Sequence, residues 1–286
     1  MKDFQTLIII GAPRSGTNML RDVICQIPGF GTWPCDEINY IWRHGNITEP
    51  TDEYDTALAT AAVKDYVRDQ FRRLASKQGL NIVVEKTCAN SLRVPFVDQV
   101  IPNAKYVFIY RDGFDVVDSA LNRWKANIDL AYLMRKARYV PISDLPFYAS
   151  RYFLNRIYRF FSREQRLAFW GPQFHGMYQA LDDLSLGEVC ALQWQRCVEL
   201  SSSALDALPK GRVASVRYED FVNQPLESLN GILDDLDFNV DQDKLKLAVR
   251  NVSLNSVGKG RANLSPELEG KIRSLVGETL SKFGYE

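Results

Sequence analysis

Short apolar runs alternate along the chain with stretches in which apolar residues recur at helical spacing. Four runs predict strands that are buried on both faces, as in a parallel sheet: residues 7–10, 82–84, 106–110 and 213–216. Behind the first run, a helix is predicted by apolar residues three and four positions apart: Leu20, Val23, Ile24 and Ile27. Strands that alternate with helices predict an α/β fold with a parallel sheet and right-handed crossovers.

Three later helices have recognisable first turns. Ser185 and Glu188 have the spacing of a capping box, and Pro225 begins an apolar-periodic stretch that runs to Leu236. Residues 265–267, Ser-Pro-Glu, open a last helix. The chain contains neither an internal repeat nor a low-complexity tract, so we expect residues 1–286 to form one domain.

Residues 125–181 depart from this pattern. Aromatic side chains crowd together there, and nine Lys or Arg residues stand against three acidic ones. We predict a helical, aromatic-rich insertion at the open edge of the sheet. Its net positive charge favours an acidic ligand.

The composition excludes several classes of protein. A formal net charge of zero argues against a general polyanion binder, and no apolar segment approaches the roughly 20 residues that a membrane span needs. Residues 1–3 lead directly into the first strand without room for a signal peptide, so we expect a cytoplasmic protein. Five scattered cysteines without metal-ligand spacing predict free thiols, and the presence of only two histidines excludes a His-rich metal site.

The loop after the first strand, residues 11–18 (GAPRSGTN), is typical of a phosphate site. Two glycines five positions apart let backbone N–H groups turn inward, and the helix that follows adds the positive end of its dipole. A Walker A loop would continue Gly-Lys-Ser/Thr, but here Thr17 follows Gly16 and the cation is Arg14. The loop therefore predicts binding of a phosphate group other than that of ordinary ATP.

A second motif lies in residues 106–124 (YVFIYRDGFDVVDSALNRW). Arg111 ends the predicted strand, and Ser119 and Arg123 share one face of the following helix, opposite an apolar stripe. These three side chains could converge on one phosphate, which suits the fork of a guanidinium group. The alternative is that Ser119 and Arg123 only form a solvated face.

Together the two motifs resemble those of sulfotransferases that use 3′-phosphoadenosine 5′-phosphosulfate (PAPS). Arg123 makes the resemblance closest to the tyrosylprotein sulfotransferases and their bacterial relatives. The resemblance implies a P-loop nucleotide-kinase-like sheet flanked by helices, with PAPS as donor and no metal. It also implies that the 3′-phosphate is gripped by Arg111, Ser119 and Arg123, and that the 5′-phosphosulfate is held by the first loop, with Arg14, Ser15, Gly16, Thr17 and Asn18.

Two further segments resemble the same family. Residues 216–220 (VRYED) are similar to the segment in which a tyrosine, here Tyr218, touches the nucleotide. Residues 256–261 (SVGKGR) are similar to its C-terminal glycine-basic loop, which implies that Ser256, Lys259 and Arg261 cover the same phosphate.

The expected chemistry resembles phosphoryl transfer, in which charge stabilisation and positioning dominate and a base accepts the proton of the acceptor hydroxyl. We expect Arg14 and Lys86 to neutralise the leaving phosphate oxygen, although an isolated Lys86 could equally be an exposed residue at a strand end. The cytosolic sulfotransferases place a histidine base two residues after this lysine, where this chain has Cys88.

The tyrosylprotein group instead uses a glutamate that follows the first-loop arginine at nearly the distance at which Glu37 follows Arg14. We therefore expect Glu37 to be the general base. The spacing leaves Asp36 open, His44 is a reserve candidate, and His175 could contact the acceptor.

Two other functions compete with this one. A P-loop kinase shares the strand–loop–helix start but lacks support here, because Gly-Lys-Ser/Thr and an obvious magnesium aspartate are missing. A nucleic-acid-binding module could use the basic, aromatic residues 125–181, but their aromatics cluster at helical spacing, as core residues do, so we expect no nucleic-acid partner. We expect residues 125–181 to bind the acceptor, and their net positive charge favours an acidic or already sulfated one, such as a saccharide or glycolipid. A peptide tyrosine as acceptor and a homodimer stay open.

Overall fold

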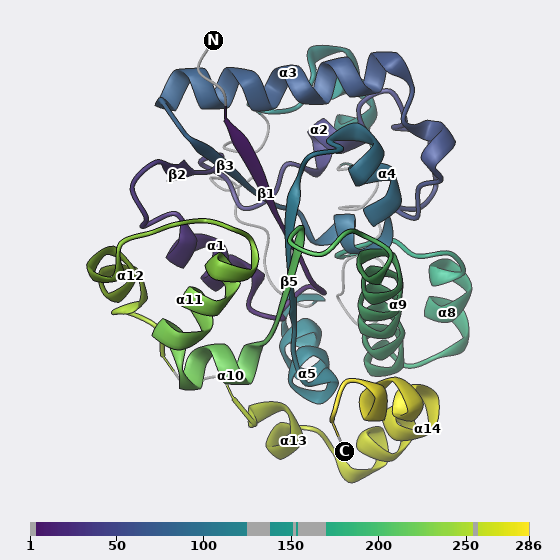
Figure 1. The fold of residues 1–286 in the computed structure, drawn as a ribbon. Helices are drawn as coiled ribbons and strands as arrows, with labels where there is room; N and C mark the ends of the chain where they lie inside the picture. The colour runs from purple at the N-terminus through teal and green to yellow at the C-terminus, as the bar shows by residue number, and fades with distance from the viewer. Residues whose placement is uncertain (1–3, 125–137, 151–152, 154–169, 254–256, 286) are drawn as a thin grey trace.

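Five parallel strands form one sheet in the computed structural model, which describes residues 4–124, 138–150, 153, 170–253 and 257–285 (Figure 1). The strand order is β2-β3-β1-β4-β5, and every neighbouring pair is parallel. The strands are β1 (Gln5–Ile10), β2 (Phe30–Gly31), β3 (Ile82–Lys86), β4 (Lys105–Tyr110) and β5 (Val213–Arg217). Four of them confirm the predicted strands; β2 was missed because two residues carry no periodic pattern. The central place of β1 brings its carboxyl end between those of β3 and β4, where open α/β sheets bind ligands.

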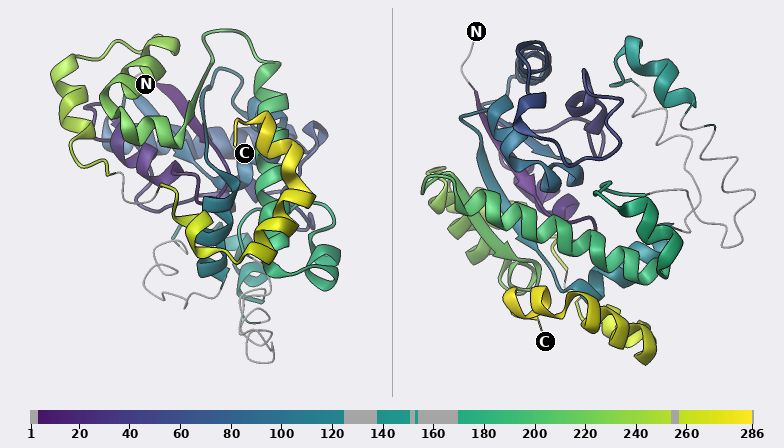
Figure 2. Two further views of the ribbon diagram at one scale, coloured as in Figure 1. Left: turned by 90° about the horizontal axis from the view of Figure 1, so that it is seen from below. Right: turned by 90° about the vertical axis from the view of Figure 1, so that its right-hand side faces the viewer.

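Helices cover both faces of the sheet, and side chains of β1 alternate between the two apolar clusters beneath them (Figures 1 and 2). Leu7 and Ile9 pack into one cluster with α1 (Thr17–Ile24), α10 (Tyr218–Asn223), α11 (Pro225–Asp235) and α12 (Gln242–Val249). Ile8 and Ile10 pack into the other with α3 (Ala61–Gln78), α4 (Val94–Val100), α5 (Gly113–Trp124), α8 (Met177–Asp183), α9 (Leu186–Asp206) and α14 (Pro266–Lys282). The short elements are α2 (Asn39–Arg43), α13 (Lys259–Asn263) and the 3₁₀ turns η1 (Thr56–Leu58), η2 (Cys88–Leu92) and η3 (Ile142–Asp144).

The predicted helix starts are confirmed. Ser185 and Glu188 make both halves of the capping box of α9, and Pro225 is the first residue of α11. Two predicted helices are too long, because α1 ends before Ile27 and α11 ends before Leu236. The side chains of Ile27 and Leu236 are nevertheless buried in the same apolar cluster as their helices. The apolar pattern therefore indicates burial that continues past the end of the helix.

The described parts of residues 125–181 pack beside α2. The ring centres of Tyr40 and Tyr148 lie 4.6 Å apart. The backbone N–H of Asp52 donates to the carbonyl oxygen of Gln173, and the Asp52 carboxylate accepts from the backbone N–H of Gln173. Ile142 is 86% exposed. The prediction of helices over 125–137 and 154–169 falls outside the described residues. Within the described part of the chain, no helix is both long and apolar enough to cross a bilayer.

Candidate functional site

The first loop is packed tightly between β1 and α1. Gly16 has a φ of 88°, a left-handed conformation that favours glycine, and a Cβ there would lie 2.3 Å from a ring carbon of Tyr218. Arg14 also has a positive φ, 70°, which is uncommon for a residue with a side chain and marks strain. The loop is therefore held in one shape by its contact with Tyr218, which the sequence predicts at the nucleotide.

Two polar atoms of this loop are buried without a hydrogen-bond partner among the described residues. They are Oγ of Ser15, a residue with no exposed surface, and Oδ1 of Asn18. Leaving such a group unpaired costs about 1–3 kcal/mol. The Ser15 hydroxyl can donate to an anion, and so can the first N–H groups of α1, which have no acceptor within the helix. The Asn18 amide oxygen can only accept a hydrogen bond, so it is the Ser15 hydroxyl and these N–H groups that fit a phosphate or sulfate group.

Arg14 of the first motif and Arg111 of the second lie close together at this loop. Arg14 Nε donates to Ser119 Oγ at 2.8 Å, and Arg111 Nη1 donates to the carbonyl oxygen of Arg14 at 3.2 Å. The Arg111 guanidinium lies 4.4 Å from the centre of the Tyr218 ring. Burial, followed by the positive charge of Arg123, lowers the pKa of Arg14. Ser119 is thus half-buried and bonded to Arg14, whereas Arg123 is exposed on α5, as the solvated-face alternative expects. The nearby positive charges favour a bound anion.

The C-terminal loop is attached to the start of α5 by two carboxylates. Asp115, which is 3% exposed, accepts hydrogen bonds from Gly258 N at 2.9 Å and Gly260 N at 2.6 Å. The same carboxylate accepts from Arg111 Nη2 at 2.8 Å, and Asp112 Oδ2 lies 3.2 Å from Arg261 Nε. The loop thus reaches the predicted clamp through Asp115.

Of the other residues predicted in that loop, Lys259 is exposed on α13, and Ser256 lies outside the described residues. Asp115 itself was missed by the sequence analysis. Its signal was present, because Arg111 and Asp115 are four residues apart, the spacing of an ion pair across one helical turn.

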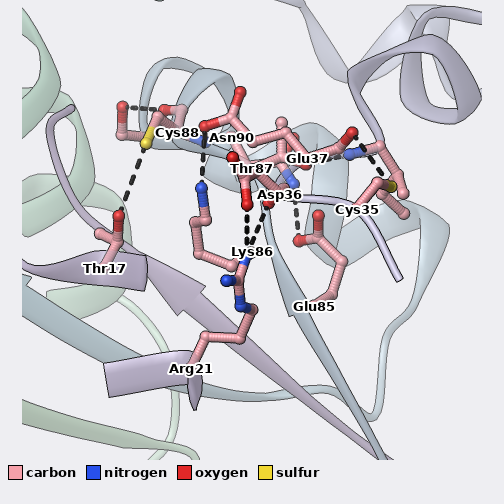
Figure 3. Close-up of polar contacts among 12 residues, drawn as sticks. Thr17, Arg21, Cys35, Asp36, Glu37, Glu85, Lys86, Thr87, Cys88 and Asn90 are labelled. Carbon is pink, nitrogen blue, oxygen red and sulfur yellow. Dashed lines mark hydrogen bonds and ion pairs between the residues drawn. The ribbon is translucent and has the colours of Figure 1, made fainter. Parts of the chain in front are cut away.

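Glu37 and Lys86 meet at the carboxyl end of β3, on the other side of the first loop (Figure 3). Lys86 Nζ donates to Glu37 Oε1 at 3.0 Å, and the backbone N–H of Cys88 donates to the same oxygen at 3.4 Å. Cys88 Sγ lies 3.7 Å from Thr17 Oγ1, so the pair sits beside the first turn of α1. Lys86 is only 4% exposed, which rules out the alternative of an exposed lysine.

The protonation states of these groups follow from burial and from the ion pair. Burial is the largest single influence on Lys86 and opposes its charge, but the charge and hydrogen bond of Glu37 act together with Cys88 to raise the lysine pKa. Burial, followed by the charge of Glu37, raises the pKa of Cys88 to about 12. The lysine is therefore a cation near pH 7, while Cys88 is a neutral thiol.

The alternative bases are engaged elsewhere. Asp36 lies 3.6 Å from Arg21, whose guanidinium also donates to the Asp36 backbone carbonyl. His44 bonds to Asp144 at 2.8 Å, and His175 bonds to Glu53 at 2.8 Å on the surface. Among these candidates, Glu37 is the one bonded to Lys86.

A sulfotransferase-domain family model matches residues 4–283. The chain belongs to the sulfotransferase family. No curated protein matches it. Among solved structures, the sulfotransferase domain from the curacin biosynthetic pathway is 14% identical, with a TM-score of 0.57 over 100% of this chain and 99% of that one. Mouse sulfotransferase SULT7A1, complexed with PAP, is 14% identical, with a TM-score of 0.54 over 98% of this chain and 86% of that one.

Sulfotransferase STF9 from Mycobacterium avium is 13% identical, with a TM-score of 0.53 over 100% of this chain and 78% of that one. These similarities confirm the predicted fold, and the family confirms that this sulfotransferase is an enzyme of sulfuryl transfer. Over the described ranges, no group of three or more His, Cys, Asp or Glu side chains could hold a metal ion. The five cysteines of the sulfotransferase all lie in the described part of the chain, and none of them is joined to another by a disulfide bond.

Proposed function

We propose that this sulfotransferase transfers a sulfuryl group from PAPS to a hydroxyl group of a saccharide or glycolipid. The observation that supports this most is the pairing of Lys86 with Glu37 beside the phosphate loop. It places a buried cation and a carboxylate together at the carboxyl edge of the sheet, where a leaving oxygen and an acceptor hydroxyl would meet.

The donor would be held by its two phosphate ends. Arg111, Ser119 and Arg123 would take the 3′-phosphate, and Ser15 and the N–H groups of α1 would take the 5′ end. Since Arg14 Nε bonds to Ser119, Arg14 would lie between the two phosphates. Tyr218 would contact the nucleotide, while Ser256, Lys259 and Arg261 would cover the 3′-phosphate.

The chemistry then assigns a role to each member of the pair. PAPS supplies the sulfuryl group; the sulfur–phosphate oxygen bond breaks as a bond forms between sulfur and the acceptor oxygen. Lys86 and Arg14 would stabilise the negative charge on the leaving oxygen, and Glu37 would accept the proton of the acceptor hydroxyl. No step in this scheme requires a metal ion.

The acceptor class rests on charge and on the identity of the base. Residues 125–181 carry nine basic against three acidic residues, which favours an acidic or sulfated glycan over a neutral one. A glutamate base in place of a histidine keeps a peptide tyrosine as the second candidate. Both acceptors present a hydroxyl group to the same carboxylate.

Two measurements test this proposal. Calorimetry with 3′-phosphoadenosine 5′-phosphate (PAP) in the presence of a chelator is expected to show binding; absence of heat and of a thermal shift at millimolar PAP would contradict PAPS as donor. Incubation with PAPS labelled in the sulfuryl group, and a panel of saccharides, glycolipids, phenols and tyrosine peptides, then identifies the acceptor. Label found only in the tyrosine peptides would overturn the saccharide or glycolipid assignment.

A further inference from the structure

The guanidinium group of Arg93 is buried near the segments that carry Glu37 and Lys86 and is not part of that ion pair. Arg93 has no exposed surface and stands at the start of α4. Its Nε donates to Asn90 Oδ1 at 2.9 Å, and its Nη2 donates to Asn39 Oδ1 at 2.5 Å. Its Nη1 lies 3.5 Å from Asp52 Oδ1. One side chain therefore joins its own segment, with Asn90, to Asn39 and Asp52, which are 54 and 41 residues away in the sequence.

Two of those segments carry the proposed catalytic pair. Asn39 follows Glu37 by two residues and also donates to Asp52 at 3.3 Å. Asn90 donates to Glu85 at 3.0 Å, and Glu85 directly precedes Lys86. Arg93 thus contacts, through one asparagine on each side, the segment of the base and the strand of the lysine.

The energetics argue that this arrangement does more than stabilise the fold. A buried ion pair is weak evidence for stability, because the cost of removing two charges from water offsets their attraction. A guanidinium does, however, hold several acceptors at fixed angles in its plane, which an apolar residue cannot do. The Asp52 carboxylate is shared by Arg93 and Arg43, at 3.5 and 2.9 Å, and so offsets part of the two buried positive charges. The cluster is thus suited to fixing geometry.

We propose that Arg93 is a positioning residue, which acts through Asn39 to hold Glu37 against Lys86. This inference rests on the proposed function, in which Glu37 is the general base. The segment of Glu37 needs such an anchor, because the Glu37 side chain is 27% exposed at the rim of the site. The backbone N–H of Ile38 donates to Thr87 Oγ1 at 3.2 Å and ties the same segment to the end of β3. Arg93 supplies the second attachment of this segment, through its hydrogen bond to Asn39.

The direct test is Asn39→Ala, which removes the acceptor of Arg93 without emptying the buried charge site. We expect kcat with labelled PAPS to fall roughly tenfold to a hundredfold, because a displacement of about 1 Å can cost that much. Affinity for PAP, measured by calorimetry, is expected to stay within about twofold, because no donor contact is removed. Arg93→Lys keeps the charge but loses the fork, and we expect the same pattern from it.

A double-mutant cycle separates positioning from general damage. If Asn39 acts through Glu37, adding Asn39→Ala to Glu37→Gln costs no further turnover, because the base is already absent. Asn46→Ala is the control: this asparagine is buried, whereas Asn39 is half-buried, and its side chain donates to Leu58 O at 3.2 Å and not to a partner of Arg93. We expect the control to lower Tm while kcat of the folded enzyme is kept.

Three outcomes would count against the inference. Unchanged kcat in Asn39→Ala would overturn it, and so would a fully additive effect in the double variant, because the asparagine would then act independently of Glu37. Normal turnover of Glu37→Gln would have a different meaning. It would reject Glu37 as the base, and the inference would fall together with that part of the proposed function.

Discussion

The nucleotide end and the catalytic end of the site are built in different ways. At the nucleotide end, Ser15 Oγ and Asn18 Oδ1 are buried without a partner among the described residues, and several arginines crowd together. At the catalytic end, Lys86 already donates to Glu37, and a network of buried side chains supports the segments behind them. In the proposed function the donor would supply a partner for Ser15 at the first end, whereas the second end is hydrogen-bonded within the protein itself.

This difference separates binding from turnover. Ligand groups can replace the missing partners at the nucleotide end, so a substitution there is expected to change affinity for the donor. The catalytic end contributes through charges that are already oriented, so a substitution there is expected to change kcat. The predictions below test this division, beginning with the largest expected effect.

Glu37→Gln is expected to lower turnover by roughly 10²–10⁴-fold, which is the usual contribution of a positioned general base. The two side chains are nearly equal in size, so PAP affinity is expected to be kept. Initial rates with labelled PAPS and calorimetry with PAP measure the two quantities. Near-normal turnover would transfer the role to Asp36 or His44.

Arg111→Ala is expected to affect affinity selectively. If Arg111 binds the 3′-phosphate, the preference for PAP over a nucleotide with only the 5′-phosphate falls by roughly ten- to a hundredfold, because a charged hydrogen bond contributes about 1.5–3 kcal/mol. The two ligands share every 5′ contact, so the ratio of their dissociation constants cancels general damage to the site. An equal loss for both would show that Arg111 supports the fold instead.

Asp115→Asn is expected to weaken PAP binding by about tenfold, since the C-terminal loop and Arg111 would lose a shared charged acceptor. Asp118→Asn is the matched control on the same helix. Its carboxylate contacts Asn263 of the same C-terminal segment at 3.1 Å and is exposed at the rim. Calorimetry that shows equal losses in the two variants would contradict a specific role of Asp115.

The smallest expected effect concerns stability and pH. Burial raises the pKa of Glu85 to about 7, so between pH 6 and 7 the folded protein binds more protons at this residue than the unfolded chain does. The Glu85 contribution to the free energy of unfolding therefore decreases by roughly 1 kcal/mol as pH rises through that unit. Glu85→Gln is expected to remove this decrease, as measured by urea unfolding at both pH values. An identical pH dependence in the two proteins would contradict it.

The parts of the fold and site that could be predicted depend on local spacing. Apolar runs identified four strands, because each run lies within one strand and its periodicity is local. Arg111 and Ser119 were assigned to the proposed clamp through their resemblance to the motif of a known family. β2 escaped because it has only two residues.

Only the tertiary structure decided which side chains support the segments of the proposed catalytic pair. Glu37 and Lys86 are 49 residues apart, and Arg93 and Asn39 are 54 apart. The sequence by itself named Glu37 and Lys86 through their resemblance to a family, but it carried no signal that Arg93 would join their segments. From the sequence alone, a single arginine after a 3₁₀ turn is expected to lie at the surface. Only the packing of α4 with α3, α9 and the turns η1 and η2 removes it from water, and a guanidinium buried in this way has to find its acceptors on the segments that surround it.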